Sequence, residues 1–216
     1  MSGVGERQGT GASGVTGLLL AGGAGRRMGT DKASLEFEGR PLARRVAALL
    51  GEVCDTVLVA SGDGRRLDWL GLEQVADPVP GAGPLAGLVA GMELTRTPLM
   101  AAVAVDMPYA SPAVLRLLIE RWADGTDAVV PATDRRLEPL HAVYARTATP
   151  ALRDALESGE RAVHRALRRL AVTILGPGEW RSADPEGRFA FNLNFPEDLP
   201  GPPDAPAGPD HRAALA

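Results

Sequence analysis

The segment from Leu20 to Lys32, LAGGAGRRMGTDK, combines four glycines with three cations directly after the apolar run VTGLLL. Glycines tolerate positive φ angles and close approach, so their backbone N–H groups can converge on a phosphate. Arg26, Arg27 and Lys32 add enough positive charge to neutralise much of a triphosphate. Lys32 is the only lysine in the chain, since every other one of the 23 basic residues is an arginine. A lone lysine favours a site that needs a compact point charge, because arginine supplies a planar fork instead.

Two common phosphate-binding motifs do not fit this segment. The P-loop requires a Gly-Lys pair, which the chain lacks. The dinucleotide fingerprint requires glycine at position 28, where Met28 stands. A surface loop with incidental charges is the alternative, but ligands bind at the carboxyl ends of strands in open α/β sheets. The position of the segment after the first predicted strand therefore favours a nucleotide-binding loop.

Two aspartates follow predicted strands. Asp106 comes after the apolar run 99–105, and Asp77 comes after the shorter run 72–76. A carboxylate at a strand end suits Mg²⁺, which commonly takes one or two carboxylates plus phosphate oxygens. Asp106 is therefore a candidate metal ligand, and its alternative role is to cap the turn formed with Met107 and Pro108. For Asp77 an ordinary Asp-Pro turn competes with a role in ligand binding.

Alternating apolar runs and helical patterns surround these residues. Continuous apolar runs predict strands buried on both faces. Helices with one apolar stripe are predicted between them, and Ser111 is expected to cap the third. The predicted strands span 15–21, 56–61, 99–105 and 127–132, and the predicted helices 41–53, 83–94 and 111–122. This order predicts right-handed βαβ units, hence a Rossmann-like three-layer α/β/α fold with a mostly parallel central sheet. An extended segment outside the sheet is expected over 134–146, followed by one or two helices over 147–170.

Composition predicts one domain. The 216 residues, 45% of them hydrophobic, can bury a core over 15–199. Residues 1–14 and 200–216 are rich in glycine, proline and small residues, which predicts disordered tails. The net charge of −4 argues against nucleic-acid or anionic membrane partners. One cysteine excludes an intramolecular disulfide, three scattered histidines exclude a structural zinc site, and no signal-peptide or membrane segment is evident, so we expect a cytoplasmic protein.

The motif LAGGAGRRMGTDKASL resembles the signature of the sugar-nucleotide-pyrophosphorylase-like nucleotidyltransferases, and most closely that of the molybdenum cofactor guanylyltransferases. Five further segments resemble that family: GPLAG at 83–87, Asp106-Met107-Pro108, HAVYAR at 141–146 preceded by Pro139 and Leu140, GERAV at 159–163 and FNLNFPEDL at 191–199. The resemblance implies a nucleotide-diphospho-sugar-transferase-like fold. It also implies transfer of GMP from GTP to the phosphate of molybdopterin-bound molybdenum cofactor, with Mg²⁺ as cofactor and pyrophosphate as the second product.

The resemblance also implies roles for individual residues. Lys32, Arg27 and Asp106 would form the catalytic set, with Arg27 at the phosphates, Lys32 at the α-phosphate and Asp106 at Mg²⁺. The implied nucleotide-binding residues are Leu20, Ala21, Gly22, Gly23, Lys32, Asp77 and Asp106. The implied acceptor-binding residues are His141, Arg161, Asn192 and Asn194.

The acceptor residues carry structural alternatives. A lone histidine such as His141 is more often a packed structural residue, and paired asparagines also close tight turns. Two positions depart from the family pattern. Phe195 stands where the family usually has threonine, and Ala60 where it often has asparagine, although Ser61 can substitute there.

The sequence leaves three other functions open. The first is a cytidylyltransferase acting on the same cofactor, or an enzyme that acts on another small phosphorylated acceptor, since either would use the same fold. Cytidylyltransferases of this family usually have Leu-Ala-Ala-Gly in the loop, so Gly22 and Gly23 favour guanine over cytosine. A non-catalytic nucleotide-binding or cofactor-delivery protein is the second, which Lys32 and Asp106 disfavour. The third, a dehydrogenase, lacks its fingerprint. The family also implies transient contacts with cofactor-synthesis proteins or recipient molybdoenzymes.

Overall fold

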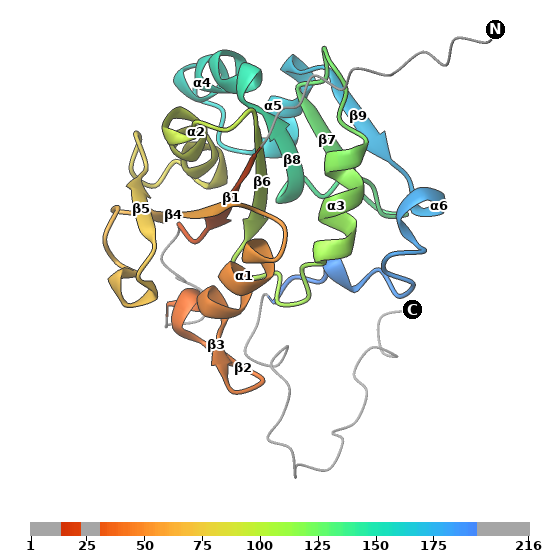
Figure 1. The fold of residues 1–216 in the computed structure, drawn as a ribbon. Coiled ribbons are helices and arrows are strands. Elements are labelled where there is room, and N and C mark those ends of the chain that lie inside the picture. The colour runs from red at the N-terminus through yellow and green to blue at the C-terminus, as the bar shows by residue number, and fades with distance from the viewer. Residues whose placement is uncertain (1–13, 23–30, 194–216) are drawn as a thin grey trace, which may run out of the picture.

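The computed structural model describes residues 14–22 and 31–193 and places seven strands in one mixed sheet (Figure 1). The sheet order is β5-β4-β1-β6-β8-β7-β9. These strands are β1 (Val15–Leu20), β4 (Thr56–Gly62), β5 (Glu73–Ala76), β6 (Leu99–Ala104), β7 (Ala128–Pro131), β8 (His141–Ala145) and β9 (Val172–Leu175). A separate hairpin pairs β2 (Glu36–Phe37) with β3 (Arg40–Pro41). The predicted disorder of both tails lies outside the described residues.

Helices cover both faces of the sheet, as the sequence predicts. They are α1 (Leu42–Gly51), α2 (Pro84–Leu94), α3 (Pro112–Glu120), α4 (Thr149–Glu157), α5 (Val163–Ala166) and α6 (Pro177–Trp180). Side chains of α1 and α3 pack into one apolar cluster with Leu19 of β1. Side chains of α2, α4 and α5 pack into the other with Leu18 and Leu20. Consecutive residues of β1 thus enter opposite clusters, because side chains alternate across a strand. None of the described helices is long and apolar enough to cross a membrane.

The ends of the predicted helices follow ordinary capping chemistry. The Ser111 hydroxyl accepts a hydrogen bond from the Val114 amide at 3.3 Å and begins α3, as predicted. Pro84 occupies the first turn of α2, where its missing N–H costs nothing. The expected one or two helices over 147–170 are α4 and α5.

The segment 134–146 corrects a prediction, because it does not stay outside the sheet. Its residues His141–Ala145 form β8, which runs antiparallel between β6 and β7. All five residues are buried, and the Tyr144 hydroxyl donates to the Pro139 carbonyl at 2.7 Å. An antiparallel strand needs no crossover helix, so the alternation of strand and helix along the chain does not reveal it. The short parallel strand β9 beside β7 was likewise not predicted.

The strand order reverses beside β1. From β1 the chain adds β4 and β5 on one side and then crosses to β6 on the other, where it pairs in parallel with β1. The crevice outside the carboxyl ends of strands at such a reversal is the usual ligand site of open α/β sheets. The chain leaves β1 at Ala21 and β6 at Val105, and the Val105 amide donates to the Leu20 carbonyl at 3.0 Å. The residues that follow β1 and β6, among them Ala21 and Asp106, therefore lie at the kind of crevice where open α/β sheets bind ligands.

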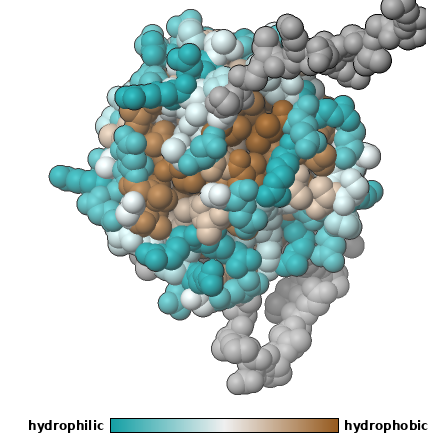
Figure 2. All heavy atoms as spheres, in the orientation of Figure 1, coloured by the Kyte–Doolittle hydropathy of each residue, from teal (hydrophilic) through white to brown (hydrophobic). Residues whose placement is uncertain are grey.

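The surface is largely hydrophilic around apolar patches. Figure 2 shows hydrophobic residues gathered in the middle of the viewed face, with hydrophilic residues around them. Large hydrophobic side chains that are exposed among the described residues are Trp69, Val79, Leu94 and Ile174. These four residues lie at separate positions along the chain, and exposed hydrophobic side chains of this kind are normal for a globular domain.

The contact between α2 and β1 gives a stability prediction. A Cβ at Gly91 would lie only 2.6 Å from Leu18 Cδ1, and Leu18 is fully buried. Gly91→Ala is therefore expected to lower the free energy of unfolding by about 1–3 kcal/mol, since overpacking forces side chains off their rotamers. Chemical denaturation measures the effect. Gly51→Ala is the control, because a Cβ there meets no atom within 4 Å; an equal loss in both variants would contradict the prediction.

Candidate active site

Lys32 and Asp106 meet at the carboxyl ends of β1 and β6. Lys32 is the first residue of a short 3-10 helix, η1 (Lys32–Ser34), and Asp106 lies two residues beyond the end of β6. The Lys32 Nζ donates to Asp106 Oδ2 at 3.2 Å, with about a fifth to a quarter of each side chain exposed. The same ammonium donates to the Leu193 carbonyl at 2.9 Å. One cation and one carboxylate of the predicted catalytic set thus stand together at a partly open site.

Leu193, the last described residue, contacts both members of this pair through its backbone. The Leu193 amide donates to the Asp106 carbonyl at 2.8 Å, while the Leu193 carbonyl accepts from Lys32. Leu193 is itself buried. Neighbouring Asn192 donates its side-chain amide to the Ala190 carbonyl at 2.9 Å. The segment resembling the family's Asn-x-Asn motif therefore reaches the Lys32–Asp106 pair through its backbone.

Asp77 lies in a corner formed by glycines. Its amide donates to the Gly62 carbonyl at 3.0 Å, and a Cβ at Gly22 would lie 3.5 Å from its Oδ2. A Cβ at Gly87 of α2 would lie 3.5 Å from Oδ1. Oδ1 is buried and has no hydrogen-bond partner among the described residues, and burial raises the pKa of the carboxyl. A buried acceptor without a donor is costly, so this corner fits a ligand that brings N–H or O–H groups.

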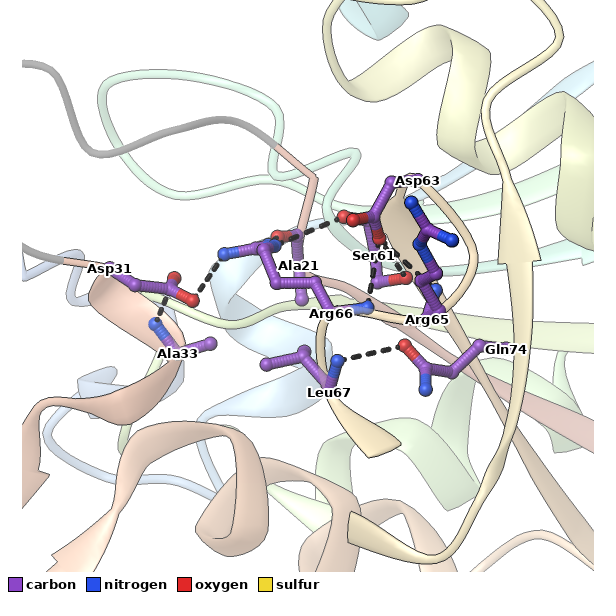
Figure 3. A network of polar contacts seen from close by, with 9 residues as sticks. All are labelled: Ala21, Asp31, Ala33, Ser61, Asp63, Arg65, Arg66, Leu67 and Gln74. Carbon is purple, nitrogen blue, oxygen red and sulfur yellow. Dashed lines mark hydrogen bonds and ion pairs between the residues drawn. The ribbon is translucent and has the colours of Figure 1, made fainter. Parts of the chain in front are cut away.

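Arg66 is a residue of this edge that the sequence analysis missed (Figure 3). Its guanidinium donates to the Ala21 carbonyl, pairs with the Asp31 carboxylate and donates to the Ser61 carbonyl at 3.3 Å. Ala21 and Asp31 bracket the glycine-rich loop. The only sequence signal was a pair of arginines after the turn Gly-Asp-Gly at 62–64, and it does not tell Arg66 from Arg65.

Two adjoining cavities lie near Asn192, which lines the larger of them. The larger, about 910 Å³, has mostly apolar walls with polar groups from Arg136, Glu138, His164, Arg168 and Asn192. Burial raises the pKa of the Glu138 carboxyl, and the hydrogen bond from Arg136 opposes this. The smaller cavity, about 300 Å³, shares Pro139, Leu140 and His164 with the larger. A mostly apolar cavity with a few polar groups is the ordinary form of a small-molecule site.

Arg161 lines the smaller cavity together with the loop before α2. Its guanidinium donates to the Leu156 carbonyl at 3.0 Å and to the Glu160 carbonyl at 2.9 Å, so it caps the end of α4. A Cβ at Gly83 would lie 3.3 Å from the Arg161 carbonyl. The two segments GPLAG and GERAV, far apart in sequence, therefore lie side by side.

His141 differs from the other predicted acceptor residues because it is fully buried. Its Nε2 accepts from the Ser111 amide at 3.1 Å, and its ring packs 4.9 Å from that of Phe189. Burial lowers the pKa of the imidazole to about 4. This burial favours the structural alternative for His141, and its contact with the acceptor stays a prediction.

The buried imidazole predicts a pH-dependent stability. In the folded chain His141 binds a proton only near pH 4, whereas its ordinary pKa is 6.5. Between these values the unfolded chain binds more protons, so the free energy of unfolding falls as the pH drops from 6.5 to 4, by at most about 1.4 kcal/mol per pH unit. Urea titrations across this range measure the slope. His141→Gln is expected to flatten it, whereas the exposed control His164→Gln is not; an unchanged slope in His141→Gln would contradict the assignment.

The metal prediction can be tested against the donor set. Among the described residues no group of three or more His, Cys, Asp or Glu side chains could hold a metal ion. Mg²⁺ rarely uses such a cage and is often bound by one or two carboxylates together with substrate phosphates. The Asp106 carboxylate is partly exposed and lies beside β1, where the strand order reverses, so it fits binding of Mg²⁺ by one carboxylate together with substrate phosphates. Gly23, Arg27 and Asn194, the remaining predicted site residues, lie outside the described residues.

Comparison with known proteins agrees with this architecture. Residues 17–172 match the MobA-like NTP transferase domain. A probable molybdenum cofactor guanylyltransferase of Chloroflexus aggregans is 38% identical over 191 residues, covering 86% of this chain and 91% of that protein. One from Methanosarcina mazei is 35% identical, covering 84% and 87%. The solved structure of molybdopterin-guanine dinucleotide biosynthesis protein A from Archaeoglobus fulgidus has a TM-score of 0.75 at 31% identity, covering 85% of this chain and 94% of that one.

Sheet order and site together define a nucleotidyltransferase of the nucleotide-diphospho-sugar-transferase-like α/β class, which confirms the predicted fold class. The matches narrow the class further. The chain belongs to the MobA-like NTP transferase family, as its signature loop predicted.

Proposed function

We propose that this chain transfers GMP from GTP to the terminal phosphate of molybdopterin-bound molybdenum cofactor. The observation that carries the proposal is the Lys32–Asp106 pair at the carboxyl ends of β1 and β6. It unites the lysine of the glycine-rich loop with the carboxylate predicted to bind a metal. The relatives named as molybdenum cofactor guanylyltransferases support the choice of substrates.

In the proposed reaction an oxygen of the acceptor phosphate attacks the α-phosphorus of GTP. A new oxygen–phosphorus bond forms, the bond between the α-phosphorus and the bridging oxygen breaks, and pyrophosphate leaves with the electron pair. The protein needs no covalent intermediate, so its work is positioning and charge stabilisation. Bound Mg²⁺ would supply positive charge to the phosphate oxygens and the leaving pyrophosphate, and Asp106 is the residue that would hold it.

Other residues of the edge have distinct proposed roles. Lys32 meets negative charge developing at the α-phosphate, for which a compact ammonium that already bridges two acceptors is well placed. Asp77 accepts a hydrogen bond from the nucleotide in the glycine-lined corner beside Gly22. Leu20 ends β1 and Ala21 follows it, and both stay predicted contacts of the nucleotide. Gly23 and Arg27 stay predicted contacts of the phosphates.

The two adjoining cavities are the proposed acceptor site. A pterin presents both an apolar ring face and polar edges, which suits apolar walls with a few donors and acceptors. Arg161 and Asn192 are the predicted acceptor residues that line these cavities. Leu193 next to Asn192 contacts Lys32, so an acceptor held there lies beside the reacting centre. Transient contacts with cofactor-synthesis proteins or recipient molybdoenzymes stay a prediction.

Pyrophosphate release with molybdenum cofactor, Mg²⁺ and either GTP or CTP tests the proposal. We expect release with GTP and far less with CTP. A preference for CTP would support the cytidylyltransferase alternative instead. Binding of Mg²⁺-GTP in calorimetry, without release for any pterin acceptor, would support the non-catalytic alternative and overturn the proposed activity.

A further inference from the structure

The guanidinium of Arg66 joins three segments that are separate in sequence (Figure 3). Its terminal nitrogens reach the Ala21 carbonyl after β1 and the Asp31 carboxylate before η1. Its Nε donates to the Ser61 carbonyl of β4 at 3.3 Å. About a quarter of the side chain is exposed, so these contacts are partly shielded from water. Three acceptors in different directions match a planar arginine fork, which a lysine could not reproduce.

The backbone around Arg66 is held on both sides. The Asp63 carboxylate accepts from the amides of Arg65 and Arg66, at 3.1 and 2.9 Å, and these bonds lower the pKa of its carboxyl. The next residue, Leu67, is fully buried, and its amide donates to Gln74 Oε1 at 3.0 Å. The Arg66 side chain therefore projects from an anchored turn toward Ala21 and Asp31.

Asp31 connects Arg66 to the turn that carries Lys32. One carboxylate oxygen pairs with Arg66, and the other accepts from the Ala33 amide at 3.1 Å and caps η1. Lys32 is the first residue of that capped turn and extends its ammonium to Asp106. A continuous series of contacts thus runs from Arg66 through Asp31 and η1 to the reacting centre.

We infer that Arg66 is a positioning residue, which fixes Lys32 for transfer by holding Asp31. The inference rests on the proposed function, in which Lys32 stabilises the reacting phosphate. Of the three partners of Arg66, only Asp31 caps η1, so we expect the effect of Arg66 on turnover to pass through Asp31 and Lys32. Loss of alignment at a reacting group can cost turnover without a comparable loss of substrate affinity.

Steady-state kinetics of Arg66→Ala test this role. We expect kcat to fall about 10- to 100-fold while KM for GTP changes much less. The control is Arg65→Ala, because the exposed Arg65 side chain makes no hydrogen bond or ion pair with the described residues. Arg65→Ala is expected to leave both constants unchanged.

A double-mutant cycle separates positioning from general stability. If Arg66 acts through Lys32, then Arg66→Ala added to Lys32→Ala causes little further loss of kcat. An equal fold-loss in both backgrounds would overturn the inference. So would a loss that appears in KM alone.

A readout without catalysis distinguishes this inference from the proposed function. The capped turn protects the amides of Ala33 and Leu35, which donate to Asp31 Oδ1 and to the Lys32 carbonyl. We expect faster hydrogen exchange at both in Arg66→Ala and unchanged exchange in Arg65→Ala. Unchanged exchange in Arg66→Ala would overturn the positioning role. Absence of pyrophosphate release by the natural protein would instead overturn the proposed function.

Discussion

Replacement of Lys32 by alanine is expected to lower turnover by ~10²-fold or more while the protein remains folded. The ammonium lies at the crevice beside β1 and β6, 3.2 Å from Asp106 Oδ2 and 2.9 Å from the Leu193 carbonyl. In the proposed reaction it stabilises charge that grows in the transition state, so its removal affects kcat more than substrate affinity. Pyrophosphate release under saturating GTP measures the effect. Circular dichroism and thermal unfolding check that the fold persists.

Lys32→Arg tests whether the site requires a compact ammonium rather than positive charge alone. It keeps the charge but replaces a compact ammonium, which already bridges two acceptors, with a longer planar group. We expect turnover well below that of the natural protein. Arg153→Ala is the control for loss of a cation, because Arg153 forms an exposed ion pair with Glu93 on the helical layer. Full activity in Lys32→Arg would mean that the solitary lysine carries no special role, and full activity in Lys32→Ala would remove it from the mechanism.

Asp106→Asn is expected to have the second large effect, a loss of ~10²- to 10³-fold in turnover at ordinary Mg²⁺ concentrations. Asparagine has nearly the same size and keeps the backbone carbonyl that accepts from the Leu193 amide. It removes the negative charge that would bind Mg²⁺ and that pairs with Lys32. Turnover measured across a Mg²⁺ titration is expected to require a much higher concentration of the metal.

A matched control and an opposite outcome define that experiment. Asp154→Asn on α4 removes an exposed carboxylate, and we expect an unchanged Mg²⁺ response. If Asp106→Asn also keeps the natural response, Asp106 caps its turn and does not bind the metal. Because Asp106 and Lys32 are in contact, the two substitutions are not expected to add independently.

Much of the fold could be predicted from local patterns. Continuous apolar runs identified β1, β4, β6 and β7, since strands buried on both faces need apolar residues at every position. The apolar stripes of α1 and α3, together with the Ser111 cap of α3, predicted those two helices. The Gly-Pro start and apolar run of α2 predicted the third, which is buried over Leu85–Met92. The strand β8 was missed because nothing local distinguishes an extended segment inside a sheet from one outside it. Its burial depends on β6 and β7, which are distant in sequence.

The candidate site divides in the same way. Residue types alone identified Lys32 and Asp106, because a glycine-rich loop with cations and a carboxylate after a strand are chemical signals in themselves. Arg66 gave no such signal, because arginines are abundant in this chain. Its guanidinium contacts the backbone carbonyls of Ala21 and Ser61 and the carboxylate of Asp31, and none of these groups marks it in the sequence. Burial also favours the structural role of His141, which its sequence environment had already made the more common of the two roles.

Local residue patterns were enough to predict the family and the alternation of strand and helix. The phosphate contacts of the glycine-rich loop stay a prediction, because residues 23–30 lie outside the described part of the chain. Which of the described groups meet depends on the tertiary structure. Lys32 and Asp106 are 74 residues apart, and Lys32 and Leu193 are 161 apart, yet all three lie at one edge of the sheet. The physical reason is the order of the parallel strands. Which carboxyl ends become neighbours depends on long-range pairing, with β6 crossing to the other side of β1, and local residue patterns do not encode that choice.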